Sequence, residues 1–179
     1  MRFKCVVFDL DGTLVNTLSD IALAMNTALG ERGFPVLPVD AYSGIVGNGI
    51  RRLARSALPE DRRDEKTVEE LAGRAGQLYA EKPVVYSKIY PGIQELLFEL
   101  GKLRIRSAVL TNKPDPVAHM VIDRLFPAGA FDAVQGELPG VPRKPDPSST
   151  WELLLNLDVT PRETIFAGDS EVDLETAVA

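Results

Sequence analysis

The chain has 179 residues, which suits one domain or one domain with a modest insert. Its formal net charge of −6 argues against a general nucleic-acid binder, because such proteins need a basic face. The single cysteine, Cys5, excludes an internal disulfide and argues against a cysteine metal site, so we expect a cytoplasmic location. The sequence shows no apolar run long enough to span a bilayer and no signal peptide, so no membrane partner is expected.

The predicted elements begin with a strand over residues 4–10, KCVVFDL, whose apolar, β-branched run is typical of a strand buried on both faces. Helices are predicted over residues 17–32, 47–58 and 66–81, and Gly33 is a plausible stop for the first. Further along, helices over residues 91–100, 116–125, 147–157 and from 171 onward alternate with strands over 104–110, 132–135 and 164–167. This alternation indicates an α/β fold with a doubly wound, Rossmann-like parallel sheet.

The purely helical stretch interrupts the alternation of strands and helices. We therefore predict an all-α domain over residues 17–82, inserted after the first strand of a core domain that comprises residues 1–16 and 83–179. In doubly wound sheets the site lies at the carboxyl ends of the strands. Asp9, Thr111 and Asp169 each follow or end a predicted strand, so we expect them to converge there.

The first motif is DLDGTLVNT, residues 9–17. Asp9 and Asp11 are two residues apart at a strand end and can face the same side. Carboxylates this close repel each other unless a divalent cation lies between them, and oxygen ligands suit Mg²⁺. Gly12 permits close backbone approach and Thr13 offers a hydroxyl, so both are candidate phosphate-binding residues. The alternative is an ordinary Asp-Gly turn after a strand, which the length of the whole motif disfavours.

Two further motifs supply polar groups near strand ends. In LTNKP, residues 110–114, Thr111 and Asn112 can donate hydrogen bonds to a phosphoryl oxygen; alternatively they cap the next helix. In RKPDP, residues 143–147, Lys144 lies between two prolines and could neutralise a nucleophile and a transferring phosphoryl group. Taken alone, either motif is better explained by a capping or surface role.

The fourth motif is FAGDSEVD, residues 166–173. Asp169 is placed as a direct metal ligand, and Asp173, one helical turn further on, can face the same way. The alternative is a helix N-terminus with capping and acidic residues, which the helix dipole favours in any case.

In their sequence order the four motifs resemble those of the haloacid dehalogenase superfamily of phosphohydrolases, over essentially the whole chain. The nearest likeness is to its phosphoglycolate phosphatase-like branch, which carries a helical (type C1) cap. The resemblance implies a Mg²⁺-dependent phosphoric monoester hydrolase that acts on a small phosphorylated metabolite through an aspartyl-phosphate. It implies these roles: Asp9 as nucleophile and metal ligand, Asp11 as general acid/base and backbone metal ligand, Thr111 and Asn112 in phosphate binding, Lys144 in charge screening, Asp169 as metal ligand and Asp173 as its support through water.

The predicted insert contains VGNGIRRL, residues 46–53, which resembles the cap loop of phosphoglycolate phosphatases. Gly47, Asn48 and Gly49 would let backbone amides approach an anion at a helix N-terminus. Arg51 or Arg52 could then meet a substrate carboxylate. The alternative is a plain helix start with an exposed basic face.

Members of the superfamily usually continue beyond the fourth motif with at least one more strand and a closing helix, whereas this sequence stops at Ala179. We therefore expect the C-terminal end of the core to be truncated and the sheet to have an uncovered edge, at a cost to stability and activity.

Two other functions stay open. A β-phosphoglucomutase-like sugar-phosphate mutase would return the phosphoryl group to a sugar, although the VGNG loop favours a hydrolase. A non-catalytic, truncated relative would keep the fold alone, although the intact set of polar motifs argues against it. The sequence leaves the physiological substrate and the oligomeric state, monomer or homodimer, undetermined.

Overall fold

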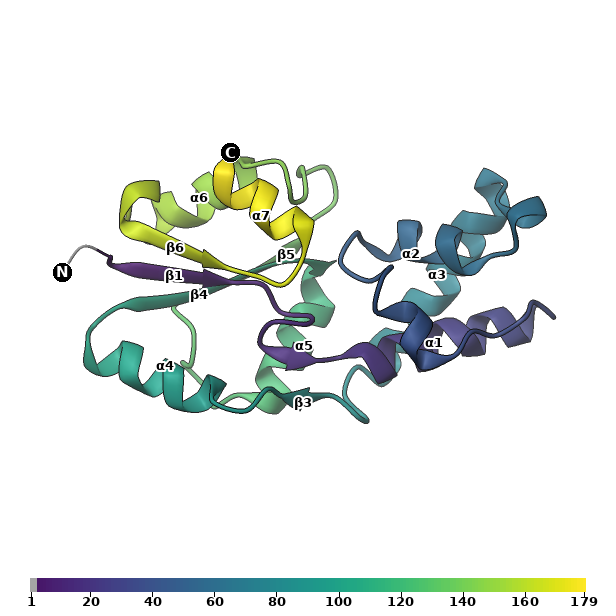
Figure 1. Cartoon of the computed structure of the whole chain (residues 1–179), viewed down its shortest axis with the longest axis horizontal. Coiled ribbons are helices and arrows are strands. Elements are labelled where there is room, and N and C mark those ends of the chain that lie inside the picture. The colour runs from purple at the N-terminus through teal and green to yellow at the C-terminus, as the bar shows by residue number, and fades with distance from the viewer. Residues whose placement is uncertain (1–2) are drawn as a thin grey trace. The chain divides into compact units, whose positions relative to one another are not determined.

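The computed structural model describes residues 3–179, whose path Figure 1 shows. The chain divides into two compact units. The core unit combines the segment that ends at Asn16 with Lys88–Ala179, and the helical unit is Thr17–Ser87. Among the described residues, none of the helices has both the length and the apolar character that crossing a bilayer requires.

A four-stranded parallel sheet forms the centre of the core unit, in the order β5-β4-β1-β6. The strands are β1 (Cys5–Phe8), β4 (Arg106–Pro114), β5 (Ala133–Glu137) and β6 (Thr164–Ala167). β1 is buried along its whole length, because strands pair with both of its edges and helices cover both faces. Phe8 pairs with Val109 on one side and with Ala167 on the other, so the residues that follow it emerge between β4 and β6.

Helices cover both faces of this sheet. Figure 1 shows α4 (Ile93–Lys102) and α5 (Asp115–Leu125) on one face, and α6 (Ser148–Asn156) and α7 (Glu171–Val178) on the other. The α6 face is apolar: Cys5, Val7 and Leu110 of the sheet form one buried cluster with Leu153 and Leu154 of α6. The predicted α/β class with a doubly wound parallel sheet is thus confirmed.

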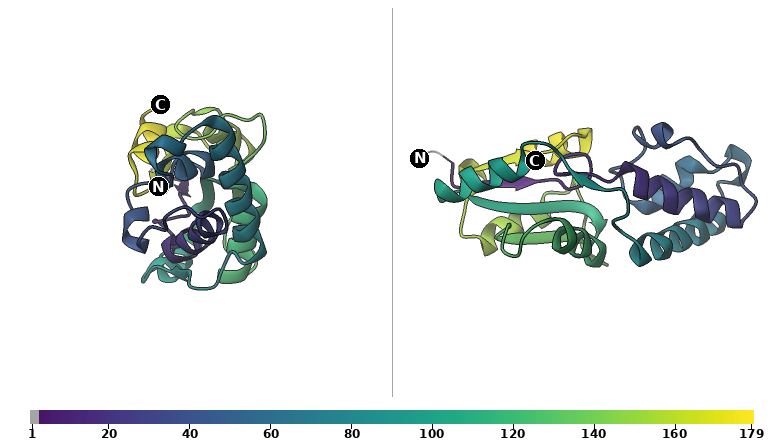
Figure 2. Two further views of the ribbon diagram at one scale, coloured as in Figure 1. Left: turned by 90° about the vertical axis from the view of Figure 1, so that its right-hand side faces the viewer. Right: turned by 90° about the horizontal axis from the view of Figure 1, so that it is seen from below.

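The helical unit is built from α1 (Leu18–Glu31), α2 (Ile50–Ala57) and α3 (Glu65–Glu81). α1 and α3 lie side by side, as Figure 2 shows, around a core that includes Met25, Leu29 and Leu71. The buried Asp20 of α1 accepts hydrogen bonds from the backbone N–H groups of Val85, Tyr86 and Ser87 and from the Ser87 hydroxyl, at 2.5–3.1 Å. This carboxylate ties the returning segment of the chain to the start of α1.

Several local features differ from the sequence predictions. A two-stranded antiparallel sheet of β2 (Val15–Asn16) and β3 (Lys88–Ile89) was not predicted, because two residues are too few to show a strand period. β4 starts at Arg106 rather than at residue 104, because Arg104 has a positive φ of 56° and belongs to the turn after α4. β4 also continues to Pro114, so Thr111 and Asn112 lie within the strand rather than after it.

Candidate active site

The first motif leaves the end of β1 and turns sharply toward the end of β6. The Asp9 N–H donates to the carbonyl of Ala167 at 2.9 Å, and only 5% of Asp9 is exposed. Gly12 has a φ of +88°, and a Cβ atom there would lie 2.3 Å from Asp169 Oδ2. The Thr13 hydroxyl donates to Asp169 Oδ1 at 2.9 Å. Glycine is therefore required at position 12 for the first and fourth motifs to meet.

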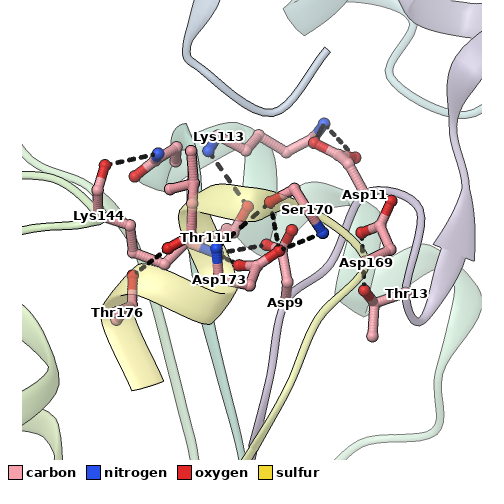
Figure 3. A network of polar contacts seen from close by, with 12 residues as sticks. Asp9, Asp11, Thr13, Thr111, Lys113, Lys144, Asp169, Ser170, Asp173 and Thr176 are labelled. Atoms are coloured by element: carbon pink, nitrogen blue, oxygen red, sulfur yellow. Dashed lines mark hydrogen bonds and ion pairs between the residues drawn. The ribbon is translucent and has the colours of Figure 1, made fainter. Parts of the chain in front are cut away.

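Three carboxylates from the two ends of the chain converge at this point (Figure 3). Asp9, Asp169 and Asp173 each offer a carboxylate oxygen, and these oxygens lie within 4.8 Å of one another. Burial raises the pKa of Asp9 from 3.8 to about 6, against the opposing effect of the Lys144 ammonium, while the charges of Asp173 and Asp11 raise it further. A site that concentrates negative charge in this way is suited to a cation.

Lys144 is the cation that this structure places among the carboxylates. Its Nζ lies 2.9 Å from Asp9 Oδ1 and 2.6 Å from Asp173 Oδ1, and its side chain is 2% exposed. The Asn112 amide donates to the Lys144 carbonyl at 3.0 Å, so strand β4 holds the third motif in position. Asn112 thereby has a positioning contact that sequence reasoning did not anticipate.

Both carboxylate oxygens of Asp173 have partners. Its Oδ1 accepts from Lys144, and its Oδ2 accepts from the hydroxyl of Ser170 at 2.5 Å and from the Ser170 N–H at 3.1 Å. This is a capping box at the start of α7. A Cβ at Gly168 would lie 2.3 Å from Asp173 Cβ, so glycine is needed there as well. In this arrangement Asp173 holds the ammonium group of Lys144 beside Asp9.

The oxygen-only donor set fits Mg²⁺, which Asp9 and Asp169 would hold. Within residues 3–179, Asp9 Oδ1 is buried without a hydrogen bond of normal geometry, although Lys144 lies close to it. Asp173, whose two oxygens are engaged, would act on a metal only indirectly.

Sequence reasoning missed one side chain of this site, that of Lys113. Its Nζ lies 2.7 Å from each carboxylate oxygen of Asp11, and its side chain is only 3% exposed. Its backbone N–H donates to Thr111 Oγ1 at 3.2 Å. A signal was present, because a lysine at the end of an otherwise buried strand needs a carboxylate partner. The identity of the partner depends on the pairing of β1 with β4, which the sequence does not show.

The remaining predicted residues belong to the helical unit and form a separate group. Gly47 and Gly49 have φ values of +107° and +80°, and Gly49 caps the N-terminus of α2. Arg51 pairs with Glu65, and its Nε lies 3.3 Å from a carboxylate oxygen of Glu69. A last contact joins Arg52 Nη1 to Asn48 Oδ1 at 3.1 Å. Both candidate arginines therefore have partners within the helical unit.

Comparison with known proteins places these features in a family. Residues 6–179 match the haloacid dehalogenase-like hydrolases. The chain belongs to that family. Two members are phosphoglycolate phosphatases: one from Pseudomonas syringae pv. tomato is 33% identical over 98% of this chain and 66% of its own length. The other, from Haemophilus influenzae strain 86-028NP, is 35% identical over 99% of this chain and 82% of its own length.

A solved structure supports the same haloacid dehalogenase-like fold. A protein from Lactobacillus delbrueckii subsp. bulgaricus superposes with a TM-score of 0.92 at 28% identity, over 99% of this chain and 83% of that one. The chain spans 66% of the length of the Pseudomonas phosphatase. The predicted resemblance to the phosphoglycolate phosphatase-like branch is thus confirmed at the level of the family.

Proposed function

We propose that this chain is a Mg²⁺-dependent phosphatase that hydrolyses a small phosphate monoester, of the phosphoglycolate class, through an aspartyl-phosphate on Asp9. The observation that carries the proposal is the meeting of the buried Asp9 and Lys144 with the exposed Asp169 at one site of the core unit. The relatives named phosphoglycolate phosphatase support the substrate class.

In the first half of the proposed reaction, a carboxylate oxygen of Asp9 attacks phosphorus. A new bond forms between Asp9 and phosphorus, the bond from phosphorus to the leaving oxygen breaks, and Asp11 gives its proton to that oxygen. In the second half, Asp11 takes a proton from the water that attacks phosphorus. The bond to Asp9 then breaks, and inorganic phosphate leaves.

The other residues of the site would stabilise charge during both halves. Thr111 Oγ1 accepts from the Lys113 N–H, so its own hydroxyl hydrogen is directed elsewhere and can be donated to a phosphoryl oxygen. Lys144 supplies a buried positive charge beside the nucleophile. Mg²⁺ held by Asp9 and Asp169, with Asp173 as indirect support, would neutralise the phosphoryl oxygens.

We further propose that the helical unit, which the sequence predicts as residues 17–82 and the structure bounds as Thr17–Ser87, reads the leaving group as a cap domain. Support comes from the glycines at the start of α2, where Gly47 and Gly49 have positive φ values and Gly49 is the N-cap residue. If Arg51 meets a substrate carboxylate, that carboxylate must compete with Glu65 and Glu69 for the guanidinium.

The proposal is tested by phosphate release from a panel of phosphorylated acids, sugars and nucleotides, with and without Mg²⁺. Wild-type protein should release phosphate only with the metal, and Asp9→Asn should be inactive. Asp123→Asn, an exposed aspartate on α5, is the matched control and should keep full activity. Retained activity in Asp9→Asn would remove this mechanism.

A further inference from the structure

Lys113 is a buried cation that the family motifs of this chain leave without a role. It lies at the end of β4, and its side chain extends along the site toward Asp11 (Figure 3). Both carboxylate oxygens of Asp11 lie 2.7 Å from its Nζ. Side-chain exposure is 3% for Lys113 and 11% for Asp11, so bulk water does little to screen this pair.

The same residue also contacts the phosphate-binding candidate on its own strand. Its backbone N–H donates to Thr111 Oγ1 at 3.2 Å. Lys113 therefore connects two side chains of the proposed mechanism, one through its backbone and one through its ammonium group.

A two-point contact limits the rotation of a carboxyl group more than a single hydrogen bond does. The contact with Lys113 reduces the number of rotamers open to the Asp11 side chain, which the reaction needs in one orientation. The ammonium group of Lys113 contacts both oxygens of an ionised Asp11 and so keeps this carboxylate in one orientation. A protonated Asp11 can still accept from the ammonium through its carbonyl oxygen, while its O–H faces outward.

We propose that Lys113 is a positioning residue that holds the Asp11 carboxyl in the orientation required for proton transfer to the leaving oxygen. This inference rests on the proposed function, in which Asp11 supplies that proton while the oxygen–phosphorus bond breaks. Lys113 acts through Asp11 and does not itself touch the phosphoryl group.

The test compares kcat/KM for two substrates, because kcat/KM reports the steps through release of the leaving group. An alkyl phosphate has a basic leaving oxygen that needs the proton, whereas p-nitrophenyl phosphate has a weakly basic one. Lys113→Met should lower kcat/KM for the alkyl phosphate by roughly tenfold or more beyond its effect on the aryl phosphate. Lys113→Arg should restore part of this loss.

A second comparison asks whether Lys113 acts through Asp11. In an Asp11→Asn background, Lys113→Met should add no further selectivity between the two substrates, because the group that it orients is gone. Thermal melting gives a test that needs no turnover. The change in melting temperature of the double variant should differ from the sum of the changes of the two single variants. Lys102→Met, an exposed lysine on α4, is the control and should leave the substrate ratio unchanged.

Several outcomes would overturn the proposal. Equal losses on both substrates indicate a merely structural lysine, and selectivity that Lys113→Met still changes in the Asp11→Asn background indicates direct contact with the substrate. If Lys113→Met does not fold, Lys113→Gln carries the same comparison. Failure of the proposed function is recognised separately, because the wild-type chain would then show no Mg²⁺-dependent phosphatase activity. In that case, additive changes in melting temperature would still refute the coupling between Lys113 and Asp11.

Discussion

Replacement of Asp9 by asparagine should stabilise the metal-free protein while it abolishes turnover. Burial raises the pKa of Asp9 from 3.8 to about 6, so the ionised carboxyl is less favourable in the folded chain than in the unfolded one. A pKa difference of this size corresponds to about 3 kcal/mol at neutral pH. Asparagine has nearly the same shape and carries no charge, and Lys144 keeps Asp173 as an ion-pair partner, so the substitution should recover up to about this amount.

The sign of the effect sets its pH dependence. The folded chain binds more protons than the unfolded chain between pH 3.8 and about 6, so the contribution of Asp9 to stability falls as pH rises through this window. The gain in unfolding free energy of Asp9→Asn over wild type should therefore be full above about pH 6 and should vanish below pH 3.8. At low pH both chains carry a neutral group at this position.

The assay is chemical denaturation in the presence of EDTA, followed by tryptophan fluorescence. Trp151 is the only tryptophan of the chain and lies on α6, so its emission reports on the core unit that holds Asp9. The exposed Asp123→Asn control should match wild type at every pH. An Asp9→Asn protein that is no more stable than wild type at neutral pH, or whose advantage is the same at low pH, would refute this reasoning.

Three further predictions concern metal binding and the local geometry. Mg²⁺ at a hundred times its Kd should raise the unfolding free energy of wild type by about 2.7 kcal/mol, and Asp169→Asn should remove this shift in thermal melts. Gly12→Ala should lower the unfolding free energy by about 2 kcal/mol or more, because the added Cβ would collide with Asp169 and the residue has a positive φ. The same variant should lose the stabilisation by Mg²⁺. The control Gly101→Ala has open space around the added Cβ and should leave the unfolding free energy unchanged or raise it. Asp20→Asn should destabilise the helical unit by roughly 1–3 kcal/mol in denaturation followed by circular dichroism, and an unchanged midpoint would contradict the importance of its hydrogen bonds.

Much of the fold could be predicted from the sequence because the signals are local. The run from Cys5 to Phe8 is apolar and β-branched, and only a strand covered on both faces accommodates it. The approach of Asp9 to Asp169 follows from a general rule, since parallel strands bring their carboxyl ends to one edge of a sheet. These predictions needed no knowledge of side-chain packing.

The remaining features depend on contacts between distant segments. The ion pair of Lys113 with Asp11 joins the end of β4 to the segment that follows β1, and it depends on which strands pair and in which register. The hydrogen bonds of Asp20 to Ser87 depend on where the chain returns after the helical unit. Neither contact has a periodic pattern, so composition and spacing could not reveal it. The catalytic roles of the site residues stay predictions until activity is measured.

The central claim is that Asp9 forms a covalent bond to phosphorus during turnover. The most direct measurement is rapid acid quenching of the protein with substrate and Mg²⁺, followed by borohydride reduction and peptide mass spectrometry. The account predicts a substrate-dependent reduction product at position 9 that is missing from Asp9→Asn. Turnover without any trapped product at Asp9, or with the product at another aspartate, would contradict it.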